Sequence, residues 1–293
     1  MTTELLELRI PVDGGTLAAS YSPGGETAII ALHGASGGTR DHPLYRHLHD
    51  VLPPVGIGVL TFDRRGEGES TGAPSGGNFE LQASDALAVM TALDVPRPGM
   101  WGFSQGAWVA PLAATMSPSV TFLVLIASTG VTPSAQMRYA TAEQLRRAGY
   151  PPGAVAQMLE LRRDLEAWIH HPEMARASEL ESALAAAHVE HWWDLAFLPS
   201  ELPDADGRRA WIAEMDFDPR PVLAHVAVPA LLFYGTDEAW TPVDESVQAW
   251  REARGDAAEV VRIEGASHEL RMPDGSLSPI YEERMLEWLA SRR

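Results

Sequence analysis

The sequence contains no cysteine and no lysine among its 293 residues. Without cysteine the chain has no disulfide, thiolate nucleophile, iron–sulfur cluster or zinc ribbon. Without lysine it has no Schiff-base chemistry, no covalently held pyridoxal cofactor and no P-loop lysine, and all 22 basic residues are arginine. No segment approaches the ~18 uninterrupted apolar residues that a membrane-spanning helix needs.

Positive charge is also scarce, and the formal net charge is −18. Nucleic acids and anionic membranes would repel such a chain, so we expect neither as a partner. The N-terminal stretch "MTTELLELRIPVDGG" has neither a basic region nor an apolar core, which argues against a secretory signal. We therefore expect a cytoplasmic protein. Its oligomeric state is left open by the sequence.

What the chain does contain is an alternation of short apolar runs with helical patterns. Strands are expected at 27–34, 57–63, 98–104, 121–128, 229–237 and about 258–263, and helices at 42–52, 78–93, 105–116, about 243–254 and about 279–291. Two earlier strands, near 4–12 and 16–22, meet at "DGG" and predict an antiparallel hairpin. Because the later strands are continuously apolar, the pattern predicts a mostly parallel α/β sheet flanked by helices.

Residues 131–217 carry helical patterns without a convincing strand, and prolines punctuate them. An all-helical insertion inside a parallel α/β domain is typical of a cap or lid. We therefore expect an α/β core at 1–130 and 218–293 with a helical cap at 131–217.

The stretch "WGFSQG" lies where a strand ends and a helix begins, as in a G-x-S-x-G nucleophile elbow. Gly102 and Gly106 are expected where any Cβ would collide with the neighbouring strand and helix. Ser104 is thereby presented at the carboxyl edge of the sheet as a candidate nucleophile.

A serine nucleophile needs a base, and the base needs a carboxylate to orient it. His268, in "GASHEL" after the last predicted strand, is the candidate base. The candidate acid is Asp237, directly after the strand that contains "LLFYG"; Glu238 and Asp244 remain competitors. Backbone N–H groups of Gln105 and of Ala35, in "HGASGG", are the candidate donors to a tetrahedral oxyanion.

Other residues are weaker candidates. Asp63 in "FDRRGEGES" is expected to brace a loop, and the stretch "HVEHWWD" to be a solvated helix face and not a metal site. Tryptophans of the helical segment could line an apolar pocket or simply pack in a core (Trp168, Trp192, Trp193, Trp211 and the nearby Trp240).

Together "LHGASGG", "FDRRGEGES", "GFSQGAWVAPLAA", "YGTDEAWTP" and "GASHEL" resemble, in this order, motifs of the α/β-hydrolase superfamily. Within it they are similar to bacterial esterase-like and prolyl-oligopeptidase-like members. The resemblance implies Ser104 as nucleophile, Asp237 as acid and His268 as base, with Ala35 and Gln105 as oxyanion donors, and no cofactor or metal.

The expected activity is that of a serine hydrolase acting on an ester or thioester of a small to medium acyl substrate. An acyltransferase, cyclase or aminopeptidase would use the same triad. A ligand-binding homologue without catalysis is the alternative from a different class.

Overall fold

A computed structural model describes residues 5–292 of the chain, which form two compact units. The core unit comprises the residues up to Gly130, Pro219–Glu238 and the residues from Val243 onward. The helical unit comprises Val131–Asp218 and Ala239–Pro242. The start expected for the first strand, at residue 4, lies outside the described residues.

Within residues 5–292 the core unit forms an eight-stranded sheet of order β1-β2-β4-β3-β5-β6-β7-β8. Its strands are β1 (Leu6–Val12), β2 (Gly15–Ser22), β3 (Thr27–Leu32), β4 (Ile57–Phe62), β5 (Arg97–Phe103), β6 (Leu123–Ile126), β7 (Ala230–Gly235) and β8 (Ala258–Ile263). β1 pairs antiparallel with β2, and β2 with β4, whereas every further pairing is parallel. The predicted fold class is confirmed.

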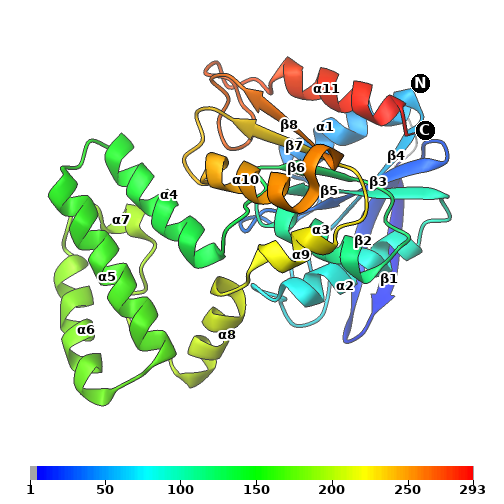
Figure 1. Ribbon diagram of the computed structural model, residues 1–293. Helices are drawn as coiled ribbons and strands as arrows, with labels where there is room; N and C mark the ends of the chain where they lie inside the picture. Colours follow the sequence, from blue (N-terminus) through cyan, green and yellow to red (C-terminus); the bar gives the residue numbers. More distant parts are fainter. Residues whose placement is uncertain (1–4, 293) are drawn as a thin grey trace. The chain divides into compact units, whose positions relative to one another are not determined.

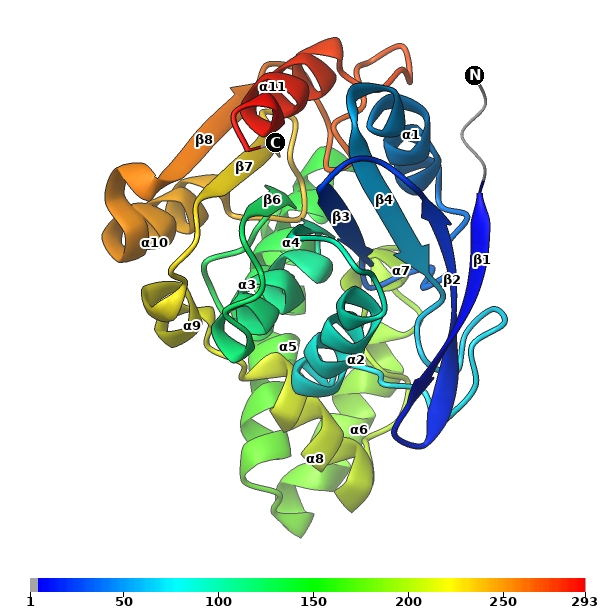
Figure 2. The same cartoon turned by 90° about the vertical axis from the view of Figure 1, so that its right-hand side faces the viewer.

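Helices cover both faces of this sheet (Figure 2). α1 (Pro43–Val51) and α11 (Pro279–Ala290) pack on one face, in a core cluster with β3, β5 and β7. On the other face lie α2 (Phe79–Thr91), α3 (Gly106–Met116), α9 (Pro219–His225) and α10 (Val243–Arg254). Every residue of β3, β4 and β7 is buried, as expected for strands that are covered on both sides.

The elbow helix α3 tolerates a proline in its interior. Pro111 has no N–H to donate to the carbonyl of Ala107, one turn earlier. The Ser128 hydroxyl donates to that carbonyl at 3.4 Å, and the Trp250 indole N–H donates to Ser128 Oγ at 3.0 Å. A side chain from the end of β6 thus replaces the missing helical hydrogen bond.

The helical unit contains α4 (Pro133–Arg147), α5 (Pro152–His170), α6 (Met174–Ala187), α7 (Trp193–Ala196) and α8 (Ala205–Met215) (Figure 1). It has its own apolar core, to which Trp168 and Trp192 belong and against which Trp193 and Trp211 pack. Packing in that core therefore accounts for these four tryptophans. No helix within residues 5–292 has the length and apolar character that crossing a membrane requires.

A half-buried histidine joins three elements of the core unit. The two ring nitrogens of His49 lie 2.8 Å from Ser22 Oγ and 3.0 Å from Thr61 Oγ1, bridging α1 to β2 and β4. Burial lowers the pKa of His49 to about 4, because the charged ring would lose its hydration. The folded state therefore holds this ring neutral.

The lowered pKa of His49 predicts a loss of stability in acid. Between pH ~6.5 and pH ~4 the unfolded chain binds a proton at this ring that the folded chain does not, so stability falls as pH falls. His49→Gln should reduce the slope of unfolding free energy against pH by up to ~1.4 kcal/mol per pH unit in this window. Urea unfolding at a series of pH values measures it, and equal slopes for both proteins would contradict the prediction.

Candidate active site

Ser104 occupies a strained turn between β5 and α3. Its φ is +53°, a left-handed conformation that non-glycine residues rarely adopt. A Cβ on Gly102 would lie 2.4 Å from the carbonyl oxygen of Gly106, and one on Gly106 would lie 2.5 Å from that of Leu32. The prediction that both elbow glycines are sterically required is confirmed.

The Ser104 hydroxyl meets His268 at the carboxyl edge of the sheet. His268 Nε2 lies 3.0 Å from Ser104 Oγ, and its Nδ1 lies 2.8 Å from Glu238 Oε2 and 3.0 Å from Oε1. With Nδ1 facing a carboxylate, the proton of a neutral ring belongs on Nδ1, and Nε2 accepts from the serine. The three side chains form one continuous chain of hydrogen bonds.

The carboxylate on His268 is that of Glu238, and the assignment of Asp237 as the acid was wrong. β7 ends at Gly235, two residues before the predicted end of that strand. The Asp237 backbone N–H donates to the carbonyl of Ala266 at 2.9 Å, and Asp237 is exposed. Glu238 is only 4% exposed. Because the chain bends at residues 236–237 after β7 has ended, the buried residue after Asp237 is the one that faces the histidine.

The other competitor, Asp244, lies in the first turn of α10, where it is exposed and forms an ion pair of 2.7 Å with Arg262 of β8. This carboxylate serves the helix terminus and the edge strand.

The segment that carries His268 is fixed against the end of β7. A Cβ on Gly235 would lie 1.9 Å from the carbonyl oxygen of Ala266, so only glycine permits this approach. The Phe103 ring packs against the His268 ring with centroids 5.1 Å apart. These contacts hold the imidazole between strand ends that are far apart in the sequence.

The candidate oxyanion donors are two backbone N–H groups that lie near Ser104. Within residues 5–292, neither the N–H of Ala35 nor that of Gln105 has a hydrogen-bond partner. Gly34 lies against the elbow, since a Cβ on it would be 3.8 Å from Ser104 Cβ and 3.1 Å from the Phe103 ring. Two unpaired N–H groups beside a nucleophile suit an incoming oxyanion.

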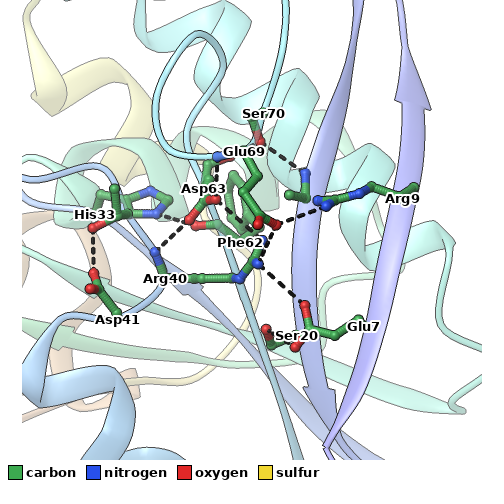
Figure 3. A network of polar contacts seen from close by, with 12 residues as sticks. Glu7, Arg9, Ser20, His33, Arg40, Asp41, Phe62, Asp63, Glu69 and Ser70 are labelled. Carbon is green, nitrogen blue, oxygen red and sulfur yellow. Dashed lines mark hydrogen bonds and ion pairs between the residues drawn. The ribbon is translucent and has the colours of Figure 1, made fainter.

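His33 and Asp63 hold the loop that contains Ala35 (Figure 3). His33 Nε2 donates to the carbonyl of Phe62 at 2.6 Å. Burial lowers the pKa of His33 to about 3, so this ring is neutral and serves to hold the loop against β4. The Asp63 carboxylate accepts the backbone N–H groups of Arg40 and Glu69, both at 2.8 Å. The prediction that Asp63 braces a loop is confirmed.

A model of the alpha/beta hydrolase family matches residues 29–277. The chain belongs to the α/β hydrolase family. It is 29% identical over 267 residues to the dihydrolipoyllysine-residue acetyltransferase component of an acetoin cleaving system from Pseudomonas putida, covering 88% of this chain but 64% of that protein's length. It is 25% identical to the AB hydrolase superfamily protein YisY of Bacillus subtilis, over 74% of this chain and 76% of the relative.

Solved structures share the fold of this α/β hydrolase. An esterase from Pyrococcus furiosus superimposes with a TM-score of 0.62 at 17% identity, covering 99% of this chain and 92% of the esterase. Among residues 5–292, no group of three or more histidine, aspartate or glutamate side chains is placed to hold a metal ion.

Proposed function

We propose that this α/β hydrolase is a serine hydrolase that cleaves an ester or thioester of a small to medium acyl substrate. The observation that carries the proposal is the hydrogen-bond chain from Ser104 Oγ through His268 to Glu238. A hydroxyl, an imidazole and a carboxylate in this order are the parts that acyl transfer through a covalent intermediate requires.

The proposed reaction has two halves. His268 Nε2 takes the Ser104 proton as Oγ attacks the acyl carbon, and the N–H groups of Ala35 and Gln105 stabilise the oxyanion. His268 then returns the proton to the leaving alcohol or thiol, which departs and leaves an acyl-serine ester. In the second half water attacks that ester with His268 again as base, and the acid and free Ser104 are released.

Glu238 has two tasks in this proposal. Its carboxylate accepts the Nδ1–H of His268 and so fixes the tautomer in which Nε2 is free to act as base. When Nε2 gains the serine proton, the buried negative charge also stabilises the imidazolium, and low exposure of the carboxylate strengthens that attraction.

Two neighbouring substitutions test this assignment. Glu238→Gln should lower kcat by up to ~10⁴-fold, because a neutral amide supports the wrong tautomer and no longer stabilises the imidazolium. Asp237→Asn, a matched removal of one charge at the next residue, should lower kcat less than ~10-fold. Hydrolysis of p-nitrophenyl esters measures both variants.

A fluorophosphonate probe supplies the control for this comparison. The probe should label the wild-type protein and both variants, the first variant slowly, and should leave Ser104→Ala unlabelled. The proposal fails if Ser104→Ala retains wild-type turnover, and the acid assignment fails if Asp237→Asn is the variant that loses activity.

Acyl transfer to a thiol is a second candidate, favoured by the similarity to the Pseudomonas putida acetyltransferase component. The same acyl-serine would then pass its acyl group to a thiolate, forming a thioester and free Ser104. Because water is in large excess, a millimolar thiol competes with it only where the protein binds that thiol.

We expect free acid to remain the main product when dihydrolipoamide is added to the enzyme and an acyl ester. Chromatography of acid and thioester measures the partition. If thioester predominates at thiol concentrations at which buffer and Ser104→Ala give none, the protein is a transferase.

We also propose that the helical unit acts as a cap that selects the substrate. In support, the chain returns to this unit at Ala239–Pro242, directly after Glu238. There the Trp240 ring meets the Phe197 ring edge to face, with centroids 5.4 Å apart. Phe197 is 52% exposed, so part of its ring is accessible to a ligand.

Phe197→Ala should therefore change the ratio of kcat/KM between a long-chain ester and an acetate ester, by roughly 10-fold. Met174→Ala removes another exposed apolar side chain of the same unit and should leave that ratio within about 2-fold. An equal effect of Phe197→Ala on every ester, acetate included, would contradict a role in substrate choice.

A further inference from the structure

The guanidinium of Arg64 is hydrogen-bonded to the loop that follows β3. Its Nη2 donates to the carbonyl of Gly34 in a short hydrogen bond, and its Nη1 lies 3.5 Å from the carbonyl oxygen of Ala35. Arg64 is 7% exposed, so these contacts lie away from competing water. The loop residues bound in this way are those beside the nucleophile.

The first of these carbonyls belongs to the same peptide group as a candidate oxyanion donor. The C=O of Gly34 and the N–H of Ala35 are parts of one planar trans peptide unit, in which they point in opposite directions. A cation bound to this carbonyl therefore fixes the direction of the Ala35 N–H. It also draws electron density toward the oxygen, which strengthens the N–H as a donor.

We propose that Arg64 is a positioning residue for catalysis, which orients and polarises the Gly34–Ala35 peptide so that its N–H receives the oxyanion. This inference rests on the proposed function, because it assigns a role within the same acyl-transfer step. Arg64 binds the carbonyl side of this peptide, opposite the Ala35 N–H, so its effect on the oxyanion passes through the peptide group.

Arg64 is itself held in place on the neighbouring loop. Its backbone N–H donates to the carbonyl of Gly38 at 2.6 Å, and its Nη1 lies 3.3 Å from Glu67 Oε1. Glu67 Oε2 in turn accepts the backbone N–H of Gly38 at 2.8 Å. The loop of residues 34–38, called the oxyanion loop here, is thus tied at both ends to the loop after β4, and these contacts hold the guanidinium on Gly34.

The adjacent Arg65 offers a matched control. It is 5% exposed, but its guanidinium pairs with Asp85 of α2 and with the carbonyl of Asp13. Its side chain makes no hydrogen bond to the oxyanion loop within the described residues. Replacing it removes a buried arginine and a buried ion pair without touching the Gly34–Ala35 peptide.

The test compares Arg64→Ala, Arg64→Lys and Arg65→Ala, each at a concentration set by fluorophosphonate titration of reactive Ser104. Arg64→Ala should lower kcat for an ester by roughly 10- to 100-fold, less than the 10²–10³ typical of deleting a donor outright. Its KM should change less than about 3-fold. Arg64→Lys keeps the positive charge but loses the planar guanidinium with its several N–H donors. Its kcat should therefore lie between that of Arg64→Ala and that of the wild type.

A merely structural role would not move two further measurements. The ratio of kcat/KM for an oxygen ester over the matching thionoester should fall in Arg64→Ala, because sulfur is a poorer acceptor and gains less from a well-aimed N–H. Added guanidinium ion should partly restore the kcat of Arg64→Ala. Arg65→Ala should show a lower melting temperature, an unchanged ester-to-thionoester ratio and no rescue.

The inference is overturned if Arg64→Ala keeps wild-type kcat per reactive serine, or if both arginine variants lose the same factor with the ratio unchanged. The proposed function fails separately, if the wild-type protein hydrolyses no ester or thioester or does so without Ser104. Once turnover is shown to depend on Ser104, the comparison of the Arg64 and Arg65 variants therefore tests only the role of Arg64.

Discussion

The site depends on one close approach of backbone to backbone, where the start of α3 meets the end of β3. With glycine at position 106, the helix can pass within contact distance of the Leu32 and His33 carbonyls. That approach puts the N–H of Gln105, which has no hydrogen-bond partner within residues 5–292, near the loop that contains Ala35. In the proposed reaction both donors are backbone N–H groups, one at the start of α3 and one in a loop that His33 and Asp63 hold, so they need little reorganisation when charge develops. A side chain at position 106 would push the start of α3 away from the end of β3 and so separate Ser104 from the loop that contains Ala35.

Around this contact the protein arranges charged and neutral groups by burial. His33 is held neutral and donates to a carbonyl, whereas the buried carboxylates of Asp63 and Glu238 each accept N–H groups that satisfy them. One carboxylate braces the oxyanion loop and the other orients His268. Asp63 and Glu238 therefore have separate tasks. The tasks follow from the groups that each carboxylate binds, since both residues lie near the same edge of the sheet.

The sequence was sufficient to predict the sheet, its helices and the meeting of Ser104 with His268, because apolar periodicity and the glycine spacing of the elbow are local signals. Asp237 was chosen over Glu238 because the strand was expected to run to residue 237, whereas β7 ends at Gly235 and the chain bends at residues 236–237, where the strand pattern no longer tells which side chain faces His268. Glutamate also reaches further than aspartate. Helix α9 is short and was not predicted. The hydrogen bond from Arg64 to Gly34 was not predicted either, because it joins residues of two different loops and leaves no periodic pattern in the sequence.

The acid loop is also where the chain links its two units. Glu238 ends a segment of the core unit, and Ala239–Pro242 belong to the helical unit, where Trp240 meets Phe197. Phe197 adopts φ +49°, and the buried guanidinium of Arg162 donates to its carbonyl and to that of Ala196. One partner of this ring contact, Trp240, thus follows Glu238 by two residues in the sequence. If the helical unit selects the substrate as proposed, residues 238–242 connect the two tasks, because Glu238 contacts His268 and the next four residues belong to the helical unit.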